Sequence, residues 1–217
     1  SHYIKIRYIK LIMSLVKHMS LGKQAKVLTE KQVKMMVSYL GERRNGLRNQ
    51  VVFMLSSKSG LRSKEISCLK WNMIVDPHGD VSDSIHLTND ASKGNSGRII
   101  PLNKDLRNSL VELLEMESQR RWFDLSSSFV IRTERSESTS PQCIVNMFQG
   151  WYRDLGYVGC SSHSGRRSFV TNTARKISLV GGSLRDVQMM VGHKNLQTTQ
   201  RYIDYNTDCQ RKVVDLV

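Results

Sequence analysis

One stretch of strand-forming sequence interrupts a chain whose other segments have helical character, and this pattern constrains the fold more than any other feature. Residues 71–75, 84–89 and 97–102 carry β-branched or alternating apolar residues, with Asp, Asn and Gly between them. Such segments predict short antiparallel strands, and the turn Lys93-Gly94-Asn95-Ser96-Gly97 joins the last two. We therefore expect an α+β, mainly helical fold with a small antiparallel sheet on one edge.

Apolar periodicity and start and stop signals predict the helices. Thr29 with Gln32 and Ser183 with Asp186 have the spacing of capping boxes, and Gly60 marks a helix end. The expected helices cover residues 29–41, 46–58, a short segment from Ser63, 103–118, 141–154, 162–177, 183–191, 195–203 and a tail helix to 217.

The chain divides into three segments by composition. Residues 1–27 contain no acidic residue and have apolar residues at helical spacing, which predicts a basic helix and linker. That helix could lie on a membrane surface, on DNA or on a neighbouring domain. Residues 28–205 are expected to form the compact domain and residues 206–217 a tail. Because the chain begins with Ser1-His2, we expect further protein upstream.

Charge and cysteine usage narrow the class of protein. The formal net charge is +14, which favours an anionic polymer as partner, although a basic protein with solvated lysines is the alternative. The four cysteines are scattered, with no Cys-x-x-Cys pair, which argues against a zinc site and for reduced thiols in a cytosol-like compartment. With no run of about 18 apolar residues, no transmembrane helix is expected.

Six residues could together cleave a phosphodiester without a metal. The reaction needs fixed cations near the non-bridging oxygens, groups that move protons, and a nucleophile that can stay attached. The candidates are Arg62, Lys93, His163, Arg166, His193 and Tyr202.

Two arginines are candidate phosphate clamps. Arg62 follows Gly60 at the expected start of a short helix, where free backbone N–H groups also favour phosphate. Glu65, one turn later, could orient Arg62 or could be an ordinary exposed acid. His163 and Arg166 are three positions apart and share a helix face, which puts a proton-transfer group beside a second clamp.

Lys93 lies in a glycine-containing turn between two expected strands. Such a turn can reach into a DNA groove and deliver a proton to a leaving oxygen. An exposed loop lysine is the alternative, and composition alone leaves Lys58, Lys64 and Lys104 as rivals.

The last two candidates lie near the C-terminus. His193 follows Gly192 at an expected turn and could donate to a phosphate oxygen or simply pack. Tyr202 is a poor nucleophile while its pKa stays near the usual value of about 10, so nearby cations or a base would have to activate it. Tyr205, three positions later, is the alternative nucleophile.

Taken together, these residues resemble the catalytic domain of the tyrosine recombinase (phage integrase) family. The resemblance spans about residues 28–205, and the order and spacing of its motifs are more specific than any one of them. The matching motifs are Gly60-Leu61-Arg62 with Glu65, Lys93-Gly94 before Arg98-Ile99-Ile100-Pro101-Leu102, His163-x-x-Arg166, and Gly192-His193 with Thr198-Thr199 and Tyr202.

The resemblance implies a DNA breaking-rejoining fold and a mechanism. Tyr202 attacks the scissile phosphate and leaves a 3′-phosphotyrosine and a free 5′-hydroxyl. Arg62, Arg166 and His193 hold the phosphate oxygens, Lys93 is the general acid for the leaving oxygen, and His163 assists proton movement at the tyrosine. No metal and no cofactor are required.

The resemblance also implies partners. The expected partners are double-stranded DNA recombination sites, with a homotetramer on DNA that passes through a Holliday junction, a monomer in isolation, and accessory DNA-bending proteins. We expect residues 1–27 to be the end of the family's upstream core-binding domain or the linker from it, and residues 206–217 to be the tail that docks on a neighbouring protomer. The expected location is the cytoplasm, in a prokaryotic nucleoid or, for a virus-encoded protein, in its host.

Four further residues are expected DNA contacts: Arg98, Arg167, Lys194 and Arg201. Arg167 stands where many family members have histidine, and Lys194 where a small residue is common, which concerns specificity more than chemistry. Two other functions remain open: a catalytically silent DNA-binding regulator with the same fold, and a type IB topoisomerase-like enzyme.

Overall fold

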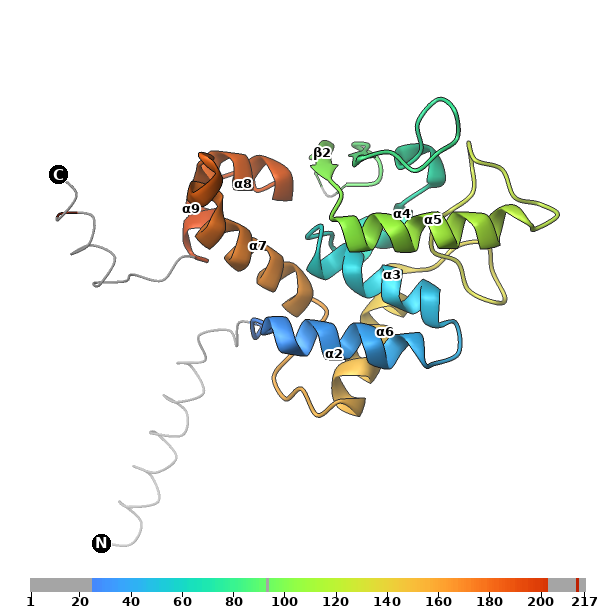
Figure 1. Ribbon diagram of the computed structural model, residues 1–217, viewed down its shortest axis with the longest axis horizontal. Coiled ribbons are helices and arrows are strands. Elements are labelled where there is room, and N and C mark those ends of the chain that lie inside the picture. Colours follow the sequence, from blue (N-terminus) through green and yellow to red (C-terminus); the bar gives the residue numbers. More distant parts are fainter. Residues whose placement is uncertain (1–24, 93, 203–213, 215–217) are drawn as a thin grey trace, which may run out of the picture.

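The structure is a computed structural model that describes residues 25–92, 94–202 and 214. Most of it is helical (Figure 1). In chain order the elements are α2 (Glu30–Gly41), α3 (Gly46–Ser57), α4 (Ser63–Cys68), the 3-10 helix η1 (Trp71–Met73), β1 (Ser84–Leu87), β2 (Arg98–Pro101), α5 (Lys104–Ser118), α6 (Pro141–Asp154), α7 (Ser164–Lys176), the 3-10 helix η2 (Ile177–Val180), α8 (Leu184–Val191) and α9 (Leu196–Gln200). The predicted fold class is confirmed.

Two predicted segments fall almost wholly outside the described residues. Of the basic segment 1–27 the structure describes only residues 25–27, and of the tail 206–217 only residue 214. None of the helices that are described combines the length and the apolar character needed to cross a membrane.

Local side-chain caps explain where the helices begin. The Thr29 hydroxyl accepts from the Gln32 N–H at 3.2 Å, and the Gln32 side chain accepts from the Thr29 N–H at 3.0 Å, so the predicted capping box is confirmed. The box formed by Ser183 and Asp186 is confirmed in the same way at the start of α8. Each cap satisfies backbone N–H groups that a helix start otherwise leaves unpaired.

Helix α3 forms the centre of the main core. Its residues from Val51 to Ser57 are all buried, and it packs against α2, α5 and α7 (Figure 1). A helix that is buried on nearly all sides must be apolar all round, which the run Val51-Val52-Phe53-Met54-Leu55 satisfies.

The sheet within the described residues has two strands, not the predicted three. Strands β1 and β2 pair antiparallel, with Ile85 opposite Ile100 and Leu87 opposite Arg98. The segment expected to form a first strand, 71–75, forms the 3-10 turn η1 and one isolated bridge, from Val75 to Val81. Trp71, Met73 and Ile74 are all buried, and the N–H of Ile74 bonds to the Trp71 carbonyl. Burial of the adjacent Met73 and Ile74 breaks the alternation that a strand would have.

A second, smaller core joins α7 to α8. Val170 and Ala174 of α7 pack with Val187 and Val191 of α8, and Tyr202 packs against this group. Because α7 also packs on α3, the C-terminal helices are fixed relative to the main core (Figure 1). The turn between α3 and α4, helix α7 and the segment from α8 to Tyr202, which carry motifs of the candidate site, are therefore held together.

Candidate active site

The turn that follows α3 presents Arg62. Gly60 has φ +68°, a conformation that favours glycine, and a Cβ atom there would lie 2.5 Å from Cδ1 of Phe169. The chain reverses at this glycine and enters α4, with Arg62 as the residue before its first turn. The Arg62 side chain is 24% exposed, so it can reach a ligand from the site while remaining held by its neighbours.

Glu65 is the fully buried carboxylate of the site. Its Oε2 accepts from the Arg62 N–H at 2.8 Å, and its Oε1 accepts from the Arg62 guanidinium at 3.0 Å. The Arg98 guanidinium donates to both carboxylate oxygens, at 3.0 and 3.1 Å. Burial raises the pKa of Glu65, but hydrogen bonding and charge from Arg98, and then from Arg62, outweigh burial and leave that pKa below its ordinary value. The predicted contact between Glu65 and Arg62 is therefore present.

Arg166 is the most buried cation of the site, at 5% exposed. From α7 its guanidinium donates to the carbonyl oxygen of Gly60 and, at 2.7 Å, to that of Val191. Burial, and then the positive charge of Arg62, lowers the pKa of Arg166 to about 9. Both partners are neutral carbonyls, so an anion placed against this group would gain favourable interaction.

His193 lies in the turn between α8 and α9. Gly192 ends α8 with φ +63°, the left-handed conformation common just after a helix. The Nδ1 atom of His193 lies 3.0 Å from the hydroxyl of buried Thr199, a hydrogen bond in which either atom can be the donor. Burial, and then the charges of Arg166, Arg62 and Arg98, lowers the pKa of His193 to about 4. The imidazole is therefore neutral at pH 7.

Tyr202 lies two residues after the end of α9 and packs against His193. The two rings are stacked, with centroids 5.8 Å apart and 19° between their planes. The guanidinium of Arg167, a residue of α7, lies 5.5 Å from the centroid of the Tyr202 ring. Arg167 was predicted as a DNA contact, and its observed position is against the candidate nucleophile.

The arrangement concentrates positive charge. Two guanidinium groups, those of Arg62 and Arg98, bind the single carboxylate of Glu65. A third, that of Arg166, lies close enough for its pKa to respond to the charges of all three, and the neighbouring imidazole is neutral. Two positive charges are thus left without a counter-charge among these groups. A partly buried site of this kind binds an anion and stabilises negative charge that develops on it.

Of the six candidate catalytic residues, four are brought together: Arg62, Arg166, His193 and Tyr202. Lys93 lies outside the described residues. His163 is exposed at the start of α7, and its backbone N–H donates to the Ser161 hydroxyl at 3.3 Å. Within the part of the chain that is described, the His163 ring has no hydrogen bond or ion pair.

The remaining predicted DNA contacts have different surroundings. Lys194 and Arg201 are both exposed. A Cβ atom added to Gly94 would lie 3.6 Å from the Lys194 ammonium. The Arg98 side chain is 6% exposed and is bound to Glu65, so an exposed contact of the Arg98 guanidinium with DNA does not fit its position. Thr199, which sequence reasoning quoted as a motif residue without giving it a role, orients His193.

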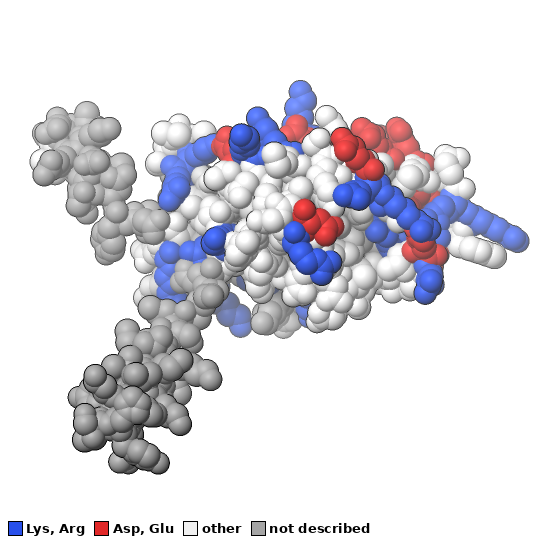
Figure 2. Space-filling model, turned by 90° about the horizontal axis from the view of Figure 1, so that it is seen from below, with Lys and Arg blue, Asp and Glu red and all other residues white. Residues whose placement is uncertain are grey.

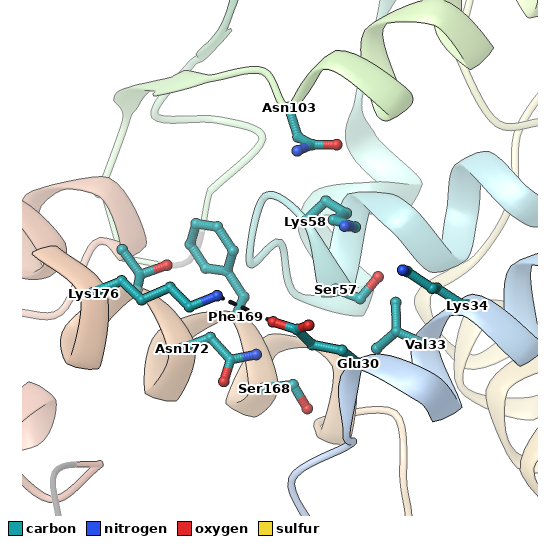
Figure 3. Close-up of a pocket in the computed structure, with 11 residues that line it drawn as sticks. Glu30, Val33, Lys34, Ser57, Lys58, Asn103, Ser168, Phe169, Asn172 and Lys176 are labelled. Atoms are coloured by element: carbon teal, nitrogen blue, oxygen red, sulfur yellow. Dashed lines mark hydrogen bonds and ion pairs between the residues drawn. The ribbon is translucent and has the colours of Figure 1, made fainter. Parts of the chain in front are cut away.

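A separate cavity is lined in part by Phe169. It has a volume of about 320 Å³, and Lys34, Lys58 and Lys176 approach it from three segments (Figure 3). The Lys176 ammonium is paired with the Glu30 carboxylate at 3.1 Å. On the face shown in Figure 2, basic side chains lie beside acidic ones in several places, including near the centre of the face. Among the described residues, no group of three or more His, Cys, Asp and Glu side chains is arranged to hold a metal ion.

Comparison with known proteins identifies the family. The model of the phage integrase family matches residues 26–208. Tyrosine recombinase XerA of Pyrococcus horikoshii is 28% identical over 193 residues, which are 88% of this chain and 60% of that protein. Tyrosine recombinase XerC of Herpetosiphon aurantiacus is 25% identical over 163 residues, 75% of this chain and 50% of that protein. The chain thus spans 50–60% of the length of these two relatives.

Solved structures agree with the fold. The crystal structure of XerA recombinase superposes with a TM-score of 0.67 at 20% identity, covering 88% of this chain and 64% of that one. The Tn1549 transposon integrase, solved in complex with circular intermediate DNA, gives a TM-score of 0.71 at 17% identity, covering 88% and 67%.

Proposed function

The chain belongs to the phage integrase family, and we propose that it is the catalytic domain of a tyrosine-type, site-specific DNA recombinase. The observation that supports this most directly is the cluster of three guanidinium groups, two of them bound to one buried carboxylate, next to His193 and Tyr202. A phosphodiester carries one negative charge and gains about one more on its non-bridging oxygens in the transition state. The two positive charges without a counter-charge match that total.

The proposed reaction is a transesterification. The Tyr202 hydroxyl attacks phosphorus and forms a phosphotyrosine bond on the 3′ side, while the bond from phosphorus to the 5′ oxygen breaks. His163 accepts the phenol proton, and Lys93 gives a proton to the leaving 5′ oxygen. The 5′-hydroxyl of a partner strand then attacks the phosphotyrosine and releases Tyr202, so the strands are rejoined with no metal in the cycle.

His193 is proposed to bind the phosphate as a neutral donor. If the Thr199 hydroxyl donates to Nδ1, the proton of the neutral ring lies on Nε2, which can then donate to a non-bridging oxygen. The lowered pKa of His193 supports this assignment, because a neutral ring needs one acceptor and one donor position. Arg62 and Arg166 would supply positive charge, and His193 would supply a directional hydrogen bond to one phosphate oxygen.

The active assembly is proposed to be a homotetramer on two double-stranded DNA sites, joined at a Holliday junction, with accessory DNA-bending proteins at some sites. Residues 206–217 would dock on a neighbouring protomer through apolar residues, namely Val213, Val214, Leu216 and Val217. Mass photometry should find a monomer without DNA and a tetramer with it. Truncation after residue 205 should abolish the tetramer and keep DNA cleavage. The proposed setting is the cytoplasm of a prokaryote or of a virus-infected host.

A covalent-capture experiment tests the function. The chain is incubated with a pool of nicked duplexes that carry randomised sequence around the nick, and adducts are collected under denaturing conditions and sequenced. The expected result is an adduct on a narrow set of sequences, formed equally with and without EDTA. Mass spectrometry should find the phosphate on Tyr202. Tyr202→Phe should form no adduct, and the matched Tyr205→Phe variant should form as much as wild type.

Two other results would redirect the proposal. An adduct that survives in Tyr202→Phe and is lost in Tyr205→Phe would move the nucleophile three residues downstream. Specific DNA binding with no adduct at all would favour a silent regulator. Lys93→Ala should slow cleavage strongly with an oxygen leaving group and only weakly with a 5′-thiol, which needs no protonation; equal losses would remove Lys93 as the general acid.

A further inference from the structure

Arg98 stands at the first position of β2, yet its side chain points into the site and is 6% exposed. Its Nη1 and Nη2 atoms donate to the two oxygens of Glu65, at 3.0 and 3.1 Å. Its Nε atom donates to the Met190 carbonyl in the last turn of α8, at 2.7 Å. One guanidinium therefore binds groups from two other elements while its backbone belongs to the sheet.

The contact with Glu65 bears on the phosphate clamp. Glu65 accepts from both the backbone N–H and the guanidinium of Arg62. A bidentate pair fixes a carboxylate in position and in plane, which a single hydrogen bond does not. Arg98 therefore sets the plane of the Glu65 carboxylate, and the carboxylate sets the direction of Arg62.

The contact with Met190 bears on His193. The carbonyl oxygens at the end of a helix carry partial negative charge, and a cation there holds the end of the helix in place. Arg98 also lies against the next turn, because a Cβ atom on Gly192 would be 3.0 Å from the Arg98 Nη1 atom. Since Gly192 directly precedes His193, displacement of Arg98 would displace the imidazole.

The third contact is with the turn between the strands. The Nη1 atom of Arg98 also donates to the Ser96 carbonyl at 3.2 Å. Ser96 belongs to the turn that runs from Lys93 to Gly97, so the same guanidinium binds the segment that carries the proposed general acid.

We propose that Arg98 is a positioning residue that aligns the phosphate clamp Arg62, the donor His193 and the turn at Ser96 with one another, and that it does not itself contact DNA. This inference rests on the proposed function. A lysine cannot replace Arg98, because its single ammonium group cannot make the bidentate contact and reach the Met190 carbonyl at the same time.

The kinetic test uses the full 217-residue chain and the nicked duplex pool. We expect Arg98→Lys and Arg98→Gln to lower the rate of adduct formation about 100-fold, the size of effect expected when catalytic groups are misplaced by about 1 Å. Affinity for a 40-bp duplex and its dependence on salt should stay at wild-type values. A loss of about one unit in the salt slope would mean a phosphate contact and would overturn the proposal.

Arg107 provides a matched control. Its guanidinium donates to the Val81 carbonyl at 2.6 Å and to the Ser82 carbonyl at 3.3 Å, and neither of these residues belongs to the candidate site. Arg107→Gln removes an arginine that ties two segments together, as Arg98→Gln does, and should leave adduct formation unchanged. Wild-type cleavage by Arg98→Lys would overturn the proposal. So would failure of both Arg98 variants to fold while Arg107→Gln folds, because Arg98 would then be a purely structural residue.

A second measurement does not depend on activity, so it separates failure of this inference from failure of the proposed function. Arg98 is one of the three charged groups that lower the pKa of His193, and it packs on the residue before it. An NMR titration of the histidine ring protons should find a higher pKa for His193 in Arg98→Gln and the wild-type pKa in Arg107→Gln. An unchanged pKa in Arg98→Gln would overturn the proposal even if wild type forms the adduct. If wild type forms no adduct, this titration still tests whether Arg98 acts on His193.

Discussion

Replacing Glu65 by glutamine tests the charge arrangement of the site with the smallest change in shape. The carboxylate is fully buried and accepts four hydrogen bonds, two on each oxygen, from Arg62 and Arg98. Glutamine keeps one oxygen and puts an NH₂ group in the place of the other. Whichever way the amide is turned, two N–H donors then face a donor.

The loss in the free energy of unfolding follows from that count. Removing one partner of a buried ion pair costs about 3–5 kcal/mol, because the remaining charge stays buried without compensation. Arg98 remains in that position in the variant, since its side chain is 6% exposed, whereas Arg62 can turn toward solvent. We therefore expect Glu65→Gln to lower the free energy of unfolding by about 3–5 kcal/mol, a large part of the 5–15 kcal/mol that is typical of a folded protein.

Urea denaturation measures the loss of stability, and this loss should depend on pH in a characteristic way. The midpoint should fall by about 1–2 M at pH 7, given an m-value of about 3 kcal/mol per M. The pKa of Glu65 in the folded protein lies below its ordinary value of 4.5, so its stabilisation is fully present above pH 4.5 and is lost as pH falls through the folded-state pKa. The difference between wild type and variant should therefore be constant from pH 5 to pH 8 and shrink on further acidification.

The matched control is Glu30→Gln. Glu30 pairs with Lys176 across two exposed side chains, where water screens the charges, so this variant should lose far less stability than Glu65→Gln. If Glu65→Gln loses no more than Glu30→Gln does, or if its loss does not change with acidification, then Glu65 is not the buried counter-charge of the arginines and the argument for a net positive site fails.

Three further predictions concern the same region. Gly60→Ala should lower the free energy of unfolding, measured with urea, by about 1–3 kcal/mol, because Gly60 has a positive φ and an added Cβ atom would meet the Phe169 ring. Adding Phe169→Leu to this variant should recover part of the loss, and no loss in Gly60→Ala would mean that the turn relaxes freely. Inorganic phosphate should raise the pKa of His193 from about 4 in an NMR titration, because an anion offsets the neighbouring cations, and an unchanged pKa would speak against phosphate binding there. Ser168→Ala should cost about 1–3 kcal/mol, because it leaves the buried Leu28 N–H without the acceptor it has at 2.6 Å; a neutral result would mean that water replaces the hydroxyl.

The sequence predicted the parts of the structure that depend on neighbours within about four positions. The capping boxes at Thr29 and Ser183 and the helix end before Gly60 are determined by contacts of this kind, and the structure has all three. The pairing of Arg62 with Glu65 is also local, since the residues are one helical turn apart.

The predictions that were wrong concern contacts between residues far apart in the sequence. Trp71 and Ile74 lie in a segment with the composition of a strand, but both are fully buried, and the chain bonds to the loop at residues 128–131 and then forms a 3-10 turn instead. That loop supplies the acceptor for the Trp71 N–H, from a carbonyl at Ser128, and no periodicity within residues 71–75 encodes a partner so far along the chain. Tertiary burial overrode local propensity here.

Arg98 shows why the site was harder to predict than the fold. In sequence it is a basic residue that follows a polar turn, and for a protein with a net charge of +14 a surface contact with DNA is the natural interpretation. Its partners are 33 and 92 positions away, at Glu65 and Met190, and only the folded chain brings the carboxylate and the end of α8 to the same guanidinium. A fully buried acid requires a cation, and the sequence shows Glu65 one turn from Arg62 but gives no sign that Glu65 is buried. Once that burial is known, the need for a second cation follows from electrostatics, and β2 is the element that supplies it.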